Sequence, residues 1–233
     1  MTVKREFRST VTDIAIVLLC GALIFTVAWG VTDRRAVQTV GAAAPCILID
    51  PGHGGADGGA EAPDGTLEKT LNLAVSRPLR DVLTVMGYTV QMTRTTDVML
   101  NTEGETLRER KVSDIHNRLA MVEQADLTVS IHQNNFTQPQ YYGTQIFYSP
   151  NTDESRVLAD SVRRQVVGML QPENTRELKR GTADVYLLHH ATRPMILVEC
   201  GFLSNQAELA KLKDAAYQRQ MAFAVAAGVM TYF

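Results

Sequence analysis

This chain contains few cysteines and little tryptophan, and its net charge is close to zero. Its 233 residues include three cysteines and one tryptophan, and the formal net charge is −2. Three cysteines do not make the paired framework of a small disulfide-stabilised fold. A charge so close to zero gives no electrostatic reason to expect a nucleic-acid partner. The chain also has no internal repeats and no low-complexity tract, so its length predicts one globular domain with a short appendage.

The appendage is the N-terminal stretch, residues 1–45. An uncharged, apolar run extends from Ile14 to Val31, and basic residues, among them Lys4 and Arg5, precede it. A run of this length is close to the minimum that spans a bilayer, and the basic residues favour a cytoplasmic N-terminus. We therefore expect a cytoplasmic tail, a transmembrane anchor and a linker. A signal peptide cleaved near Ala42 to Ala44 is the alternative, and both interpretations place the following domain outside the cytoplasm.

Residues 46–233 indicate a single α/β domain, because short apolar strands alternate with amphipathic helices. This alternation predicts a largely parallel, mixed sheet flanked by helices. Strands are expected at 47–50, 88–92, 127–131, 143–148, 185–188 and 195–198. Helices are expected at 67–86, with Thr66 as N-cap and a kink or break at Pro78, and at 107–124, 153–169 and 217–230. In such a sheet Cys46 and Cys200 fall at opposite ends, which predicts free thiols.

Three of the expected strands lead to a residue that can bind a metal ion or move a proton. His53 lies in the glycine loop after the first strand, His132 follows the third strand, and Glu199 follows the last. The carboxyl ends of parallel strands share one edge of the sheet, where α/β proteins bind their ligands. The helix that follows the first strand begins at the same edge. Glu68, in its first turn, is therefore expected close to His53.

Two histidines and one carboxylate, with one coordination position left open, are typical ligands of a catalytic zinc ion. This pattern predicts that His53, Glu68 and His132 bind Zn²⁺, and that Glu199 takes and delivers protons. Each residue also has an ordinary structural explanation. A histidine in a glycine loop is more often a turn residue, and Glu68 suits the positive end of a helix dipole. On spacing alone, the catalytic and the structural explanations carry about equal weight.

Four segments carry a resemblance to a known family. The segment Ile47–Gly59 resembles the opening motif of the zinc-dependent N-acetylmuramoyl-L-alanine amidases of the Amidase_3 family. Glu68–Asn72, Ser130–Asn134 and Val198–Asn205 are similar to its remaining motifs, in the same order. The resemblance implies a mixed sheet flanked by helices and cleavage of the amide between muramic acid and L-alanine in peptidoglycan. It also implies that the zinc ligands are the two histidines and Glu68, and that Glu199 is the catalytic residue.

Further segments resemble the sporulation members of this family. They are Arg110–Asp114, Gly143–Tyr148, Asn174–Lys179 and Asp184–Leu188. This closer resemblance implies an enzyme of spore cortex maturation and germination, active in forming muramic-δ-lactam. It further implies a membrane-anchored location with the catalytic domain in the space between forespore and mother-cell membranes. A lipoprotein activator of the GerS type is an implied partner.

Two substrate contacts and two other functions remain open on the sequence. Asn134 either stabilises the developing oxyanion or caps its loop, and Arg176 either contacts the acidic stem peptide or is a solvated surface arginine. A zinc peptidase that cuts within the stem peptide is one alternative function. A non-catalytic wall-binding module with a structural zinc is the other. Structural zinc requires a fourth protein ligand, for which Cys200 and His189 are candidates. His190 and His116 are weaker ligand candidates, the latter expected to be solvated.

Overall fold

The structure, a computed structural model, describes residues 44–233, so the predicted anchor lies outside the described part of the chain. In residues 44–233 we find no helix that is both long and apolar enough to cross a membrane. These residues form one α/β domain built on a six-stranded mixed sheet, as predicted, with the strand order β2-β1-β3-β6-β4-β5.

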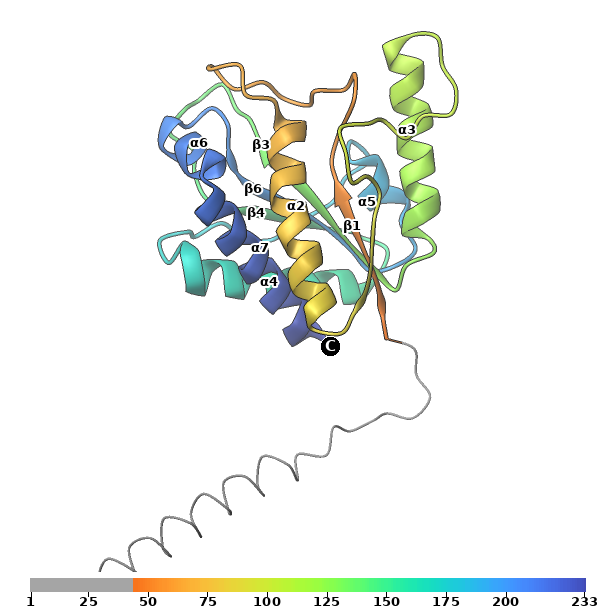
Figure 1. Ribbon diagram of the computed structural model, residues 1–233. Helices are drawn as coiled ribbons and strands as arrows, with labels where there is room; N and C mark the ends of the chain where they lie inside the picture. Colours follow the sequence, from red (N-terminus) through yellow and green to blue (C-terminus); the bar gives the residue numbers. More distant parts are fainter. Residues whose placement is uncertain (1–43) are drawn as a thin grey trace, which may run out of the picture. The chain divides into compact units, whose positions relative to one another are not determined.

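Four parallel strands form the half of the sheet that carries the candidate site. They are β2 (Thr89–Met92), β1 (Cys46–Pro51), β3 (Leu127–Asn134) and β6 (Met195–Phe202). On the far side of β6, β4 (Gln145–Tyr148) runs antiparallel to it, and the two-residue strand β5 (Lys179–Arg180) pairs with β4. The strands β2, β1, β3 and β6 therefore all end at one edge, which is uppermost in Figure 1.

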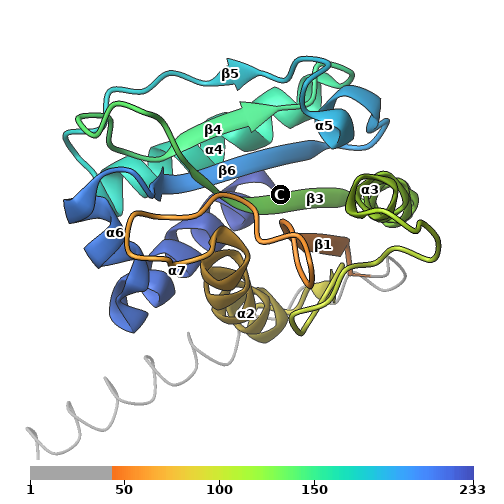
Figure 2. The same ribbon diagram turned by 90° about the horizontal axis from the view of Figure 1, so that it is seen from above.

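Helices cover both faces of the sheet (Figures 1 and 2). One face carries α2 (Glu68–Val85), α4 (Asp153–Leu170), α6 (Gln206–Lys213) and α7 (Ala215–Tyr232). The other carries only α3 (Leu107–Val122) and the short helix α5 (Tyr186–His190). Successive side chains of a strand point to opposite faces of the sheet. On β1, Ile47 and Ile49 pack in the larger apolar core, and Leu48 between them packs in the smaller core with α3 and α5. The smaller layer leaves part of its face of the sheet uncovered.

Several local expectations were wrong. The segment 185–188 was expected to be a strand, but it belongs to α5, whose Leu187 and Leu188 are buried in the smaller core. A short apolar run fits either structure, because periodicity cannot separate them over so few residues. The sequence reasoning missed α6 and β5. Leu67, not Thr66, is the N-cap residue of α2, and the helix continues through Pro78 without a break.

Two further expectations concern the cysteines and the ends of the strands. Cys46 and Cys200 are free thiols, as predicted. The strands β3 and β6 are longer than expected and include His132 and Glu199 rather than ending before them. Both residues thereby become part of the regular hydrogen-bonded ladder, which fixes how their side chains are placed relative to each other.

Candidate metal centre and catalytic site

His53 is held in a strained backbone conformation by the loop that follows β1. Its φ is 62°, and it is the one residue other than glycine with a positive φ among residues 44–233. Such a conformation is uncommon for a residue with a side chain. The ring Nδ1 of His53 bonds Asp57 Oδ2 at 2.7 Å, which leaves Nε2 to face Glu68 Oε2 at 3.2 Å. Asp57 therefore fixes which ring nitrogen is turned toward the candidate site.

Two buried arginines hold the backbone of this loop from below. Arg118 of α3 donates to the carbonyl oxygen of His53 at 2.8 Å and forms an ion pair with Asp50 at 2.5 Å. Arg94 donates to the carbonyl oxygens of Pro51 and Gly52, each at 3.0 Å. The Asp50 carboxylate also accepts a hydrogen bond from Ser130 on β3 at 2.6 Å. The strained loop is thus stabilised by charged groups from three separate parts of the chain.

Glu68 reaches the same point from the first turn of α2. Its Oε1 lies 2.9 Å from His132 Nδ1 and accepts the backbone N–H of Gln133 at 3.2 Å. Its Oε2 accepts the backbone N–H of Ala60 at 2.9 Å. The side chain is almost completely buried. Burial raises the pKa of Glu68, but hydrogen bonds and charge interactions with His132 and His53 lower it overall, so the carboxyl group stays ionised.

The predicted ligand set comes together as expected. One ligand atom each from His53, Glu68 and His132 lies within 4.8 Å of the others, and residues 44–233 contain no second group of this kind. The two imidazole rings are 5.1 Å apart between centroids. Burial lowers the pKa of His53, but Asp57 and Glu68 raise it overall to about 9. The pair of carboxylates therefore favours positive charge at this point, which suits a divalent cation bound by two imidazoles and one carboxylate.

Glu199 lies beside this group without being part of it. It is the register partner of His132 on the neighbouring parallel strand, so the two side chains leave the same face of the sheet. Glu199 Oε2 is buried and has no hydrogen-bond partner among residues 44–233. Burial raises the pKa of Glu199 to about 7. A carboxyl group whose pKa is close to neutral pH, and whose oxygen is not occupied, is suited to accept and return a proton.

The remaining predicted residues lie elsewhere or have other contacts. Arg176 is partly buried: its Nε donates to the carbonyl oxygen of Tyr142 at 2.6 Å, and its guanidinium lies 4.5 Å from the centre of the Phe202 ring. Asn134 is two residues beyond His132 on β3 and is partly exposed. Asn134 therefore follows a candidate ligand on the same strand, and Arg176 holds the loop after β3.

None of the rival ligands joins the candidate metal group. Cys200 is fully buried, and its neighbour Glu199 faces the other side of the strand. His189 and His190 lie on α5, and the His190 ring stacks on Tyr186 with centroids 4.0 Å apart. His116 is exposed, as expected, and the centre of its ring lies 5.3 Å from that of Tyr186.

A mixed α/β sheet with two histidines, a glutamate and a second, unpaired glutamate at its rim is typical of metal-dependent hydrolases. Comparison with known proteins defines the class further. Residues 47–231 match the family model of the N-acetylmuramoyl-L-alanine amidases, Amidase_3. The chain belongs to this family, and it is an N-acetylmuramoyl-L-alanine amidase acting on peptidoglycan.

Proteins similar in sequence and solved structures similar in fold both support this assignment. The chain is 35% identical to the germination-specific N-acetylmuramoyl-L-alanine amidase of Bacillus subtilis, over 80% of this chain and 79% of the relative. It is 37% identical to the CwlD amidase of Clostridioides difficile, solved in complex with the GerS lipoprotein, with a TM-score of 0.78 and coverage of 81% and 98%. For AmiC2 of Nostoc punctiforme the identity is 29%, the TM-score 0.64 and the coverage 81% and 96%. The predicted resemblance to germination amidases is confirmed.

Proposed function

We propose that this amidase uses a zinc ion held by His53, Glu68 and His132, with Glu199 as the residue that transfers protons. The observation that supports this most is the meeting of the three ligand atoms within 4.8 Å of one another, beside a buried and unpaired glutamate oxygen. When bound, zinc would polarise the scissile carbonyl and make a water molecule acidic enough to attack at neutral pH.

The chain's own residues prepare the site for that ion. Because Asp57 accepts the Nδ1 hydrogen of His53, this histidine presents Nε2 to the metal position. His132 presents Nδ1, the atom that faces Glu68. Carboxylates that hydrogen-bond to a ligand histidine fix its tautomer and increase its basicity. The structure supplies such a carboxylate for His53.

Glu199 would take part in both proton transfers of the reaction. In its ionised form it accepts a proton from the attacking water, and it then delivers that proton to the nitrogen of L-alanine as the amide bond breaks. Its register pairing with His132, and its buried oxygen without a partner among residues 44–233, support this role. Asn134, further along β3, is our proposed donor to the developing oxyanion. Arg176 was the sequence-based candidate for a contact with the acidic stem peptide, but its guanidinium already holds the Tyr142 backbone, so we assign it no substrate contact.

The biological setting that we propose follows the relatives. One is a germination-specific amidase, and another forms a complex with a lipoprotein. We accordingly propose that this chain removes stem peptides from cortex peptidoglycan, as a step toward muramic-δ-lactam, and that it works with a lipoprotein of the GerS type. The apolar run from Ile14 to Val31 would anchor it in a membrane, with the domain from residue 46 onward outside the cytoplasm.

The decisive experiment is product analysis with the full-length chain. The purified protein is incubated with spore peptidoglycan and Zn²⁺, with and without a GerS-type lipoprotein, and the products are separated by mass. We expect newly freed L-alanine amines and muramic acid without peptide, loss of both on chelation, and recovery when Zn²⁺ is returned. Cuts between stem amino acids would instead support the zinc peptidase, and binding without any cut would support the wall-binding module.

A further inference from the structure

An open groove runs along the part of α3 that borders the candidate site. It has a volume of about 400 Å³ and is lined by Leu107, Arg108, Lys111, Val112 and Ile115, which we call the α3 groove. Leu107 and Val112 are 41% and 49% exposed, so the apolar surface of the groove is accessible to solvent. Its lining combines apolar side chains with two cations, and an adjoining hollow that shares Arg108 and Val112 is also lined by Glu103 and Glu109.

Lys111 connects this groove directly to the candidate metal centre. Its Nζ forms an ion pair of 2.7 Å with Asp57 Oδ1, and the other oxygen of Asp57 bonds His53 at 2.7 Å. A lining residue of the groove is therefore two contacts away from a proposed metal ligand. A peptide extends by at most about 3.5 Å per residue, so a chain that begins at the scissile amide reaches Lys111 within a few residues.

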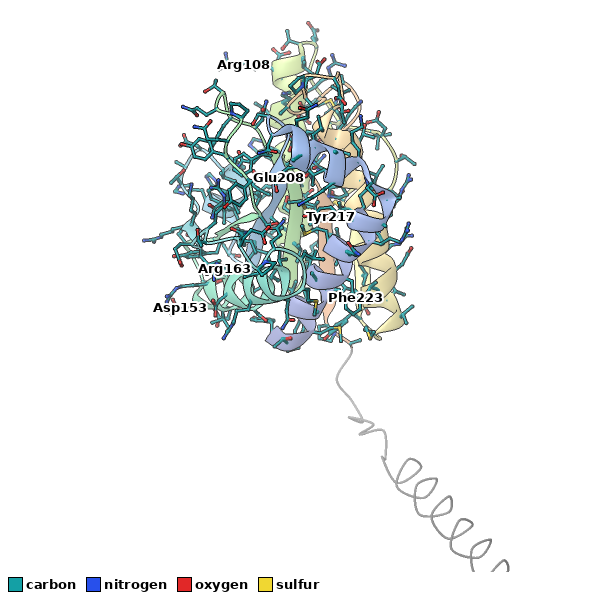
Figure 3. The ribbon with its side chains drawn as sticks, turned by 90° about the vertical axis from the view of Figure 1, so that its left-hand side faces the viewer. Arg108, Asp153, Arg163, Glu208, Tyr217 and Phe223 are labelled. Carbon is teal, nitrogen blue, oxygen red and sulfur yellow. The ribbon has the colours of Figure 1, made fainter. Side chains whose placement is uncertain are left out.

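The groove lies on a side of α3 that includes a residue packed toward α5. Arg108, Val112 and Ile115 follow one another at the spacing of a single helix face, and Ile115 packs in the core shared with α5. This face is thus turned toward the side of the sheet from which His132 and Glu199 project. Figure 3 shows Arg108 at the top of the domain, the edge at which the parallel strands end.

The charges of the groove indicate what it binds. Asp57 already neutralises Lys111. Arg108 is exposed and has no hydrogen-bond or ion-pair partner within residues 44–233, and the nearby Glu109 accepts the backbone N–H groups of Glu105 and Thr106. An accessible arginine beside exposed apolar side chains complements a ligand that alternates small apolar groups with carboxylates.

We propose that the α3 groove is the subsite for the acidic stem peptide, with Arg108 binding a side-chain carboxylate of that peptide. This inference rests on the proposed site assignment, because it requires the scissile amide to lie at His53 and His132. It places the peptide along α3. Arg176, by contrast, lies in the loop before β5 and contacts Tyr142 and Phe202. This loop is beside β4, which is on the opposite side of β6 from the strands near α3.

The test measures binding separately from cleavage. The full-length Glu199→Gln chain, which should hold its substrate without cutting it, is titrated with two muropeptides that differ only in whether the stem carboxyls are free or amidated. We expect the free-carboxyl form to bind about fivefold more tightly, the range of one partly exposed charge pair. Arg108→Gln added to this chain should remove the difference, and Arg108→Glu should reverse it.

Arg219→Gln is the matched control, because Arg219 is also an exposed arginine but lies on α7, on the opposite face of the sheet. It should leave the fivefold preference intact. Equal binding of the two muropeptides would overturn the subsite, and so would a preference that disappears with Arg176→Gln and survives Arg108→Gln. Failure of the proposed function shows separately, as absence of cleavage by the unaltered chain, so the two results can be told apart.

Discussion

His132 and Glu199 are register partners on the adjacent parallel strands β3 and β6. Neighbouring strands lie about 4.8 Å apart, and paired residues project from the same face. The proposed proton-transfer residue is therefore fixed beside a proposed metal ligand by backbone hydrogen bonds, not by a flexible loop. This arrangement explains how Glu199 can be close to the metal position and still keep its buried oxygen unoccupied.

Replacing Glu199 by glutamine should separate metal binding from catalysis. The amide keeps the shape of the side chain but cannot accept the proton, so we expect kcat to fall by about 10²- to 10⁴-fold. Bound zinc, measured by elemental analysis of the purified chain, should stay at the level of the unaltered protein. Glu177→Gln is the control, because the Glu177 side chain is 88% exposed. Unchanged peptide release by the Glu199 variant would remove this residue from the mechanism.

The meeting of His53, Glu68, His132 and Glu199 could be predicted because it follows from topology. Parallel strands end at one edge, and the helix after the first strand starts there. The expected helix starts and strand positions were close enough to place all four residues at that edge. Their exact relation was not predictable, because the strands were expected to end before His132 and Glu199, whereas the ladder includes both.

The residues that support the site were missed for a different reason. Asp57 lies in a glycine-rich loop, where no periodicity shows which way a side chain points. Its position four residues after His53 was the available signal. Arg118 reaches Asp50 across 68 residues of sequence, and a charged residue in a charged helix is ordinarily solvated. Contacts of this range depend on how α3 is placed on the sheet, which local sequence patterns do not determine.

Asp57→Asn should weaken metal binding without unfolding the chain. The amide can still accept a hydrogen bond from His53 Nδ1, but it loses the negative charge that makes this ligand more basic. We expect zinc affinity, measured by competition with a chelator, to fall about 10- to 100-fold. Asp64→Asn provides the comparison, since Asp64 also pairs with a lysine, Lys213, but lies in an exposed ion pair away from the metal group. Equal affinities for the two variants would contradict the supporting role of Asp57.

Gly52→Ala should disrupt the site through steric overlap alone. A Cβ at this position would lie 2.2 Å from both Cε1 and Nε2 of the His132 ring, whereas the backbone of Gly52 itself is not in the left-handed region. Moving a catalytic group by about 1 Å can cost 100-fold in rate, so we expect at least that loss in kcat/KM. Gly168→Ala in α4 is the matched control, because a Cβ there meets no atom of residues 44–233 within 4 Å. That variant should keep full activity and gain about 0.5–1 kcal/mol in unfolding free energy.

The ion pair between Asp50 and Arg118 should make the domain sensitive to acid. Burial raises the pKa of Asp50, but the Arg118 guanidinium and the hydrogen bonds from Ser130 and Thr93 lower it overall to about 2. The folded-state pKa is thus below the unfolded value of about 3.9. The resulting stability, about 2 kcal/mol, is fully present above pH 4 and is lost as the pH falls toward 2.

Urea unfolding at a series of pH values tests this expectation. The unfolding free energy of the unaltered chain should decline between pH 4 and pH 2, and Asp50→Asn should reduce the steepness of that decline. The same variant should lose about 3–5 kcal/mol at pH 7, because it leaves the buried Arg118 charge without this carboxylate. Asp81→Asn, at a carboxylate whose side chain is 63% exposed, should change neither result. A pH profile of Asp50→Asn as steep as that of the unaltered chain would show that other carboxylates control acid unfolding.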